Sequence, residues 1–250
     1  MRRFALIGFP LGHSFSKRYF TEKFEREGIL DAVYDLFPLE NIQQFSGLFE
    51  SYPDLVGLNV TIPYKEAVIP FLQQLDETAA AVGAVNCIHR VNGLLTGYNT
   101  DVYGFDRSLP ESLCGPDTRA LVLGTGGASK AVKYILAKRN IPFLSVSRNP
   151  RGADQVSYQD IPHLIGQYNL IINTTPLGMA PNLEAYPELP YELLGSQHFV
   201  YDLVYNPTET VLLQRAQAQG CTVMNGLDML YFQAEKAWAI WTKKQAPDSL

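Results

Sequence analysis

The chain has 250 residues, of which 46% are hydrophobic and 18% charged, and its net charge is −5. This composition is typical of a folded globular protein and excludes a disordered or fibrous chain. The absence of a strongly basic field argues against nucleic-acid binding, so we expect a protein that acts on small molecules.

Short apolar runs alternate with segments of helical spacing, which is the pattern of an α/β protein. In chain order, the predicted strands are Phe4–Gly8, Leu55–Val60, Ala84–Ile88, Leu121–Leu123, Phe143–Val146, Leu170–Asn173 and Phe199–Asp202. Apolar side chains spaced to line one face predict helices around residues 42–49, 132–136 and 229–244. A short helical segment that passes into turn residues near Gly115 marks the expected domain boundary.

The cysteines and histidines give no metal-binding pattern. Cys87, Cys114 and Cys221 lie far apart, and the four histidines have no ligand spacing, so we expect neither disulfides nor a bound metal. The amino-terminal residues are too few and too interrupted for a signal peptide, and glycines and prolines break the longest uncharged stretch, 161–183. We therefore expect a cytoplasmic protein without membrane or nucleic-acid partners, present as a monomer or a homodimer.

A glycine-rich turn follows the strand predicted at 121–123 and precedes a predicted helix. Gly124, Gly126, Gly127 and Ala128 lie in this turn. Glycines there let backbone N–H groups approach a pyrophosphate, and the helix N-terminus adds favourable partial charge. Glycine turns also arise for steric reasons alone, and the strict dinucleotide fingerprint has Gly or Ala where this chain has Ser129.

The charges after this turn favour NADP over NAD. Between residues 124 and 153 there is no acidic residue, whereas Arg148 lies 21 residues after Gly127, where an NAD site places an acid for the ribose 2′-hydroxyl. A guanidinium suits a 2′-phosphate instead, because it binds phosphate through charge-assisted, bidentate hydrogen bonds. Other basic residues of the segment, such as Lys133 and Lys138, can equally form a solvated surface.

The amino-terminal half carries polar residues at strand ends and turns. Asn59 and Thr61 alternate to the same side of a predicted strand that Pro63 ends, and Lys65 follows at the start of a helix. Together with the glycine turn, these segments resemble the shikimate dehydrogenase family over nearly the whole chain. The matching runs are His13-Ser14-Phe15-Ser16, Asn59-Val60-Thr61-Ile62-Pro63-Tyr64-Lys65, Gly83-Ala84-Val85-Asn86, Gly97-Tyr98-Asn99-Thr100-Asp101, Asn173-Thr174-Thr175-Pro176-Leu177-Gly178-Met179, Tyr201-Asp202-Leu203-Val204-Tyr205-Asn206-Pro207 and Asn225-Gly226-Leu227-Asp228-Met229.

The resemblance implies an α/β substrate-binding domain and a doubly wound, Rossmann-like NADP-binding domain, with the active site in the cleft between them. We expect the first domain to be discontinuous, comprising residues 1–103 and 230–250, and the second to comprise residues 104–229. The implied activity is the reversible, NADPH-dependent reduction of 3-dehydroshikimate to shikimate, a step toward chorismate and the aromatic amino acids.

The reaction needs a proton donor within reach of the ring oxygen, because hydride transfer to a ketone leaves an alkoxide. Lys65 fits that role as an ammonium, and Asp101 would hold it in place and favour its charged form. A surface lysine and a helix-capping aspartate are the ordinary alternatives. By the resemblance, the residues expected to contact the substrate are Ser14, Ser16, Asn59, Thr61, Asn86, Tyr205 and Gln233.

The resemblance also assigns a cofactor-binding set. Besides the glycine turn, it comprises Ser147, Arg148, Arg151, Thr175, Leu203, Gly226 and Met229. A core role is open for Leu203 and Met229, as is a turn role for Ser14 and Ser16. Two further functions stay open: a quinate/shikimate dehydrogenase that uses NAD, against which Arg148 argues, and a non-catalytic NADP-binding sensor, against which Lys65 and Asp101 argue.

Overall fold

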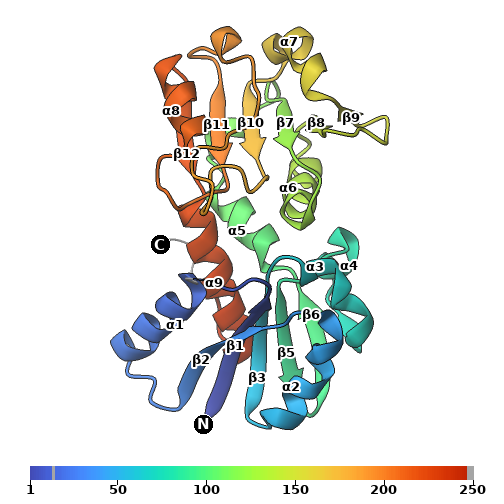
Figure 1. Cartoon of the computed structure of the whole chain (residues 1–250), viewed down its shortest axis with the longest axis vertical. Helices are drawn as coiled ribbons and strands as arrows, with labels where there is room; N and C mark the ends of the chain where they lie inside the picture. Colours follow the sequence, from blue (N-terminus) through green and yellow to red (C-terminus); the bar gives the residue numbers. More distant parts are fainter. Residues whose placement is uncertain (13–14, 247–250) are drawn as a thin grey trace. The chain divides into compact units, whose positions relative to one another are not determined.

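The computed structural model describes residues 1–12 and 15–246 and divides the chain into two units (Figure 1). Met1–Thr100 and the segment that begins at Ala234 form the first unit, and Asp101–Gln233 forms the second. The domain limits predicted from the sequence, 103/104 and 229/230, stay a prediction. Within the described residues, no helix combines the length and the apolar character that a membrane span requires.

The first unit is built on a mixed six-stranded sheet with the order β2-β1-β3-β5-β6-β4. Its parallel pairs are β1 with β2, β1 with β3 and β4 with β6, whereas β5 runs antiparallel to both β3 and β6. The strands are β1 (Arg2–Gly8), β2 (Ala32–Pro38), β3 (Leu55–Val60), β4 (Gln74–Leu75), β5 (Cys87–Val91) and β6 (Leu94–Tyr98).

Alternation along β1 gives this sheet two buried faces. Ala5 and Ile7 belong to an aliphatic core that is covered by short helices, while Phe4 packs among aromatic side chains of the longer helices. The helices of the aliphatic side are α2 (Phe45–Ser51), α3 (Tyr64–Ala67) and α4 (Glu77–Val82), and those of the aromatic side are α1 (Phe15–Arg26) and the end of α9 (Leu227–Thr242).

The second unit is built on a fully parallel six-stranded sheet with the order β12-β11-β10-β7-β8-β9. This is the doubly wound, Rossmann order, in which the strand order reverses between the first and fourth strands of the sheet, here β7 and β10. Its strands are β7 (Ala120–Leu123), β8 (Phe143–Val146), β9 (Gln155–Val156), β10 (Leu170–Asn173), β11 (Phe199–Asp202) and β12 (Thr222–Asn225), and its helices include α5 (Thr100–Ser108), α6 (Gly127–Lys138), α7 (Ile161–Leu164) and α8 (Val211–Ala218).

The predicted α/β class and the Rossmann-like second part are confirmed. Four predicted strands match β3, β8, β10 and β11 residue for residue, and the predicted helices correspond to α2, α6 and α9. The strand predicted at Ala84–Ile88 is partly wrong, since β5 begins only at Cys87. Residues 84–86 are buried without being part of a ladder, so an apolar run there did not mean a strand.

Candidate active site

The polar residues of the first unit gather at the carboxyl end of β3 and the start of β5. Asn59 is buried in β3, and its Nδ2 donates to the Asn86 carbonyl across 3.3 Å. The Asn86 carbonyl also accepts the Val60 backbone N–H at 2.9 Å. Two of the residues predicted to contact substrate therefore lie against each other.

A buried tyrosine extends this arrangement. The Tyr34 hydroxyl donates to Asn59 Oδ1 at 2.7 Å. Burial raises the pKa of Tyr34 well above its usual value, and a hydrogen bond with the Ser16 side chain opposes that rise. A continuous network thus joins Ser16, Tyr34, Asn59 and Asn86.

Tyr34 has no counterpart among the residues predicted from the sequence. It lies in β2, a strand that the apolar pattern did not reveal, and its role comes from contacts with residues distant in the chain. In the structure Tyr34 is buried and its ring stacks on that of Phe20. The spacing of apolar and polar residues in the sequence therefore could not identify Tyr34 as part of the site.

Lys65 lies in the second position of α3, directly after Pro63 and Tyr64. Its side chain is half-buried, and its carbonyl accepts the Val85 backbone N–H at 2.7 Å. This bond fixes the short helix beside the segment that leads into Asn86. Thr61 is held nearby, since its N–H donates to the Ile7 carbonyl at 2.9 Å.

Asn86 also fixes the start of α5. Its Oδ1 accepts the Thr100 N–H at 2.6 Å, and its Nδ2 lies 3.0 Å from Thr100 Oγ1. Asp101 follows Thr100 in the first turn of this helix and is buried, with 7% of its surface exposed. An acidic residue in the first turn of a helix is favourable because it interacts with the helix dipole. Asp101 therefore has a structural role available in addition to the proposed catalytic role.

In the second unit, the glycine turn joins β7 to the 12-residue helix α6, with Gly126 as the cap residue. Gly124 has a φ of +102°, and a Cβ there would lie 3.0 Å from both Thr174 Oγ1 and Thr175 Cγ2. Only glycine therefore allows the ends of β7 and β10 to approach this closely. No side chain caps the helix at Gly126, and a Cβ at that residue would meet nothing within 4 Å.

This turn lies at the position where the order of strands reverses. In doubly wound sheets, ligands bind outside the carboxyl ends of the strands at such a switch point. The backbone N–H groups that begin α6 are oriented for an anion there, with the favourable end of the helix dipole behind them. Gly127 and Ala128 are the first two residues of that helix.

A buried polar network joins the carboxyl ends of β10 and β11. Asn173 Oδ1 accepts the Thr175 N–H at 3.0 Å and its hydroxyl at 2.7 Å, while Leu203 N–H donates to the Asn173 carbonyl at 3.0 Å. The Gly226 N–H in turn donates to the Val204 carbonyl at 3.2 Å. Thr175, Leu203 and Gly226, all predicted at the nicotinamide, are thus brought together.

The remaining residues predicted to bind the cofactor follow β8. Ser147 Oγ accepts the Asn149 N–H at 3.2 Å, which holds the turn that carries Arg148. Both Arg148 and Arg151 are exposed, and among the described residues no carboxylate pairs with Arg148. Burial raises the pKa of Tyr158 and the Arg148 charge lowers it, so the guanidinium lies near that phenol.

Three other predicted residues belong to the second unit. The Met229 carbonyl lies against Gly104, where a Cβ would be 2.5 Å away, and the Met229 side chain is buried. Gln233 Nε2 donates to the Leu230 carbonyl at 2.9 Å, and Tyr205 is half-buried.

Ser14 lies outside the described residues. Across the residues that are described, no group of His, Cys, Asp and Glu is arranged to hold a metal ion.

Comparison with known proteins agrees with this architecture. Residues 6–88 match the family model described as the shikimate dehydrogenase substrate binding domain. The chain is 38% identical to the shikimate dehydrogenase (NADP(+)) of Desulforamulus reducens over 97% of its length and 90% of the relative.

Two crystal structures have the same fold. The shikimate dehydrogenase of Aquifex aeolicus is 33% identical, covers 99% of this chain and 94% of its own, and has a TM-score of 0.87. The shikimate 5-dehydrogenase of Thermus thermophilus, solved in complex with NADP(H) and shikimate, is 31% identical, covers 99% and 96%, and has a TM-score of 0.86. The chain therefore belongs to the shikimate dehydrogenase family.

Proposed function

We propose that this protein is an NADP-dependent oxidoreductase that reduces 3-dehydroshikimate to shikimate and catalyses the reverse oxidation. The observation that carries the proposal is the chain-long similarity to relatives named shikimate dehydrogenase (NADP(+)), which covers both units. The polar network at Asn59 and Asn86 and the glycine turn at Gly124 are the local features that support it.

The second unit fits a dinucleotide by its own geometry. The close approach at Gly124, the unobstructed backbone at Gly126 and the helix α6 that follows support a phosphate-binding role for this turn. Arg148, exposed and without a carboxylate partner among the described residues, suits the 2′-phosphate that distinguishes NADP from NAD. Thr175, Leu203, Gly226 and Met229 would border the nicotinamide.

The cofactor supplies or accepts the hydride, and the protein must handle the proton. In the reductive direction the ring carbonyl oxygen gains negative charge, and Lys65 is the proposed donor of the proton that neutralises it. Asp101 is the proposed residue that favours the charged form of this lysine. In the oxidative direction Lys65 takes the proton back from the shikimate hydroxyl.

The first unit would bind the substrate through hydrogen bonds. Ser14 and Ser16 are the proposed donors to its carboxylate, with Asn59, Thr61 and Asn86 near the ring hydroxyls. Because the Asn59 amide is already bonded to Tyr34 and to the Asn86 carbonyl, we propose that its main contribution is to hold Asn86 in place. Tyr205 and Gln233 are the proposed contacts from the second unit.

The test is a spectrophotometric assay of NADPH or NADH formation with two substrates and two cofactors. Shikimate and quinate are each combined with NADP and NAD, and kcat/KM is determined for all four pairs. The proposal expects the highest value for shikimate with NADP. A preference for quinate with NAD would assign the chain to the quinate/shikimate alternative, and binding of NADP without turnover of any pair would favour a non-catalytic sensor.

A further inference from the structure

Tyr34 lies on the aromatic face of the first sheet, in a strand that β1 separates from the strand of Asn59. Tyr34 is the register partner of Phe4, and Asn59 is that of Leu6, two residues further along β1. Residues two apart on a strand point to the same face of a sheet, so the side chains of Tyr34 and Asn59 project to one side. The phenol thus reaches across β1, and its hydroxyl donates to Asn59 Oδ1 at 2.7 Å.

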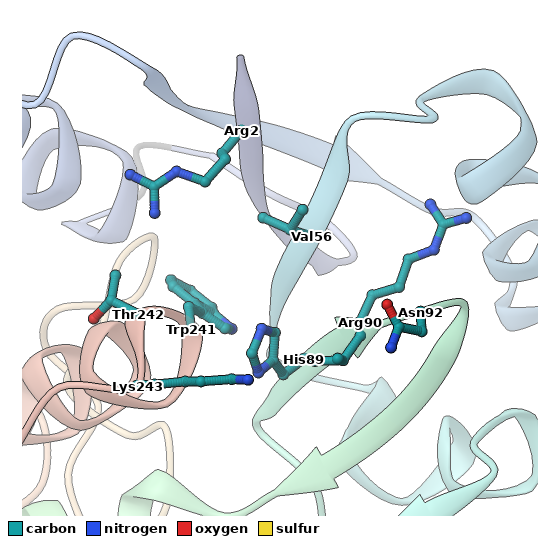
Figure 2. Close-up of a pocket in the computed structure, with 9 residues that line it drawn as sticks. Arg2, Val56, His89, Arg90, Asn92, Trp241, Thr242 and Lys243 are labelled. Carbon is teal, nitrogen blue, oxygen red and sulfur yellow. The ribbon is translucent and has the colours of Figure 1, made fainter.

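The ring of Tyr34 is fixed by packing. It stacks on Phe20 of α1, with 4.7 Å between the ring centroids and 14° between the ring planes. Trp241, drawn in Figure 2, lies 6.5 Å from the Tyr34 ring, and its own Nε1 donates to the Ile88 carbonyl at 3.0 Å. Only 4% of the Tyr34 surface is exposed. Because interior side chains are close-packed, the phenol oxygen has a fixed position.

The hydrogen bonds of this network all run in one direction. The Asn86 backbone carbonyl can only accept, so the Asn59 group that faces it across 3.3 Å is Nδ2, and Oδ1 faces Tyr34. Since Oδ1 also only accepts, the phenol gives it its single hydroxyl hydrogen. Ser16 must therefore be the donor in its hydrogen bond with the phenol, which agrees with its lowering effect on the Tyr34 pKa. A backbone carbonyl in another part of the chain thus sets the orientation of the Ser16 hydroxyl.

Ser16 is the member of this network that a ligand can reach. It is half-buried, whereas Tyr34, Asn59 and Asn86 are all buried. A hydroxyl hydrogen rotates about its C–O bond, and a carboxylate is a stronger acceptor than a neutral phenol. A substrate carboxylate would therefore take the Ser16 hydrogen without displacing the oxygen. The phenol hydrogen would then face two acceptors, Ser16 Oγ and Asn59 Oδ1, and keep both within reach.

We propose that Tyr34 is a positioning residue of the substrate site, which holds Ser16 in a fixed arrangement with Asn59 and Asn86. The inference rests on the proposed function, in which Ser16 and Asn86 are substrate contacts. A side chain that is ordered before the ligand arrives loses little conformational freedom on binding. Tyr34 therefore acts on substrate affinity, through Ser16 and Asn59, and not on hydride transfer.

Tyr34→Phe removes the hydroxyl and retains the ring that packs on Phe20. Loss of such a hydrogen bond should raise the KM and the Kd for shikimate about threefold to tenfold, with kcat and the KM for NADP near those of the parent. Tyr201→Phe is the matched control, because this buried ring stacks on Phe105 at 5.7 Å and its hydroxyl lies 2.7 Å from Ser108 Oγ. We expect the control to lower stability in urea to a similar extent and to keep the parent KM for shikimate.

A double-mutant cycle with Ser16→Ala separates positioning from a general loss of stability. If Tyr34 acts through Ser16, Tyr34→Phe should raise the KM by a smaller factor in the Ser16→Ala background than in the parent. Equal factors in the two backgrounds would overturn the proposal. So would a Tyr34→Phe variant that is less stable but keeps the parent KM and Kd for shikimate.

A measurement on the parent protein leaves the site unaltered. The Cζ signal of Tyr34, observed by carbon-13 NMR and assigned through the contact with Phe20, reports hydrogen bonding at the phenol oxygen. We expect shikimate to shift this signal saturably, and shikimate methyl ester, which keeps the ring hydroxyls without the charge, to shift it less. The Tyr201 signal should not move. Equal shifts with both ligands at saturation, or no shift with shikimate bound, would contradict the proposal.

These results distinguish the inference from the function on which it rests. A parent protein that neither binds nor oxidises shikimate would remove the proposed function and the role of Tyr34 together. Normal turnover by the parent, with the same KM for shikimate in Tyr34→Phe, would remove the role of Tyr34 alone.

Discussion

The Asn173 amide donates a hydrogen bond to Asp202 Oδ1 across 2.9 Å and thereby joins the carboxyl ends of β10 and β11. The same carboxylate accepts the Val204 N–H at 3.0 Å and the Thr210 hydroxyl at 2.6 Å. Burial raises the pKa of Asp202, and these three donors counteract the rise. Asp202 therefore holds the two strand ends that carry Thr175 and Leu203.

We predict that Asp202→Ala destabilises the protein by about 1–3 kcal/mol, because it leaves buried donors without an acceptor. Asp202→Asn keeps an acceptor for Asn173 and Val204 and should cost less. Urea denaturation measures both, and KM for NADPH should rise more in the alanine variant. If alanine and asparagine were equally stable and equally active, Asp202 would not have this positioning role.

Replacement of Lys65 by Ala should lower kcat by about 10²- to 10⁴-fold, the usual contribution of a general acid or base. The Kd for NADPH should change little, since Lys65 is not among the residues proposed to bind the cofactor. Lys138→Ala, an exposed lysine at the end of α6, serves as the control and should retain the parent rate. Normal turnover in the Lys65 variant would remove it from the mechanism.

Arg148→Gln should weaken NADPH and spare NADH. Loss of charge-assisted contacts with a 2′-phosphate corresponds to about a tenfold to hundredfold rise in KM for NADPH. NADH lacks that phosphate, so its KM is the internal control within the same variant. A parallel rise for both cofactors would indicate a general disturbance of the turn and would contradict the assignment.

His89 should make the protein less stable in mild acid. Because its folded-state pKa is lowered from the ordinary 6.5, mainly by burial, the unfolded chain binds the proton more readily than the native one. The free energy of unfolding should therefore fall as pH decreases through that value. The charged groups around the ring are Lys243, Arg90 and the Arg2–Asp31 pair. None of them is an unpaired acid, which would raise the His89 pKa and reverse the expected pH dependence of stability.

Urea denaturation between pH 7.5 and 5.5 checks this expectation. A His89→Gln variant should lose part of the pH dependence, and His163→Gln, at an exposed residue of α7, should retain it. An unchanged slope in the His89 variant would show that this histidine is not responsible.

The central strands of the second sheet, β7, β10 and β11, were predictable from the sequence because they are buried and consist of apolar runs, as in Leu170–Asn173. β2 was not, since Asp35 interrupts its apolar pattern and is stabilised by ion pairs with Arg3 of β1 and Lys17 of α1, which come from other parts of the chain. The glycine turn has a local signature, so its position between a strand and a helix could be predicted from the sequence. The Tyr34–Asn59 bond joins residues 25 positions apart and leaves no such local pattern.

Direct observation of hydride transfer tests the central claim most closely. The protein is incubated with 3-dehydroshikimate and NADPH deuterated at the transferring carbon, and the product is examined by NMR and mass spectrometry. The account predicts shikimate with one deuterium on the newly formed carbinol carbon and stoichiometric oxidation of the cofactor. Absence of shikimate, or shikimate without deuterium at that carbon, would contradict it.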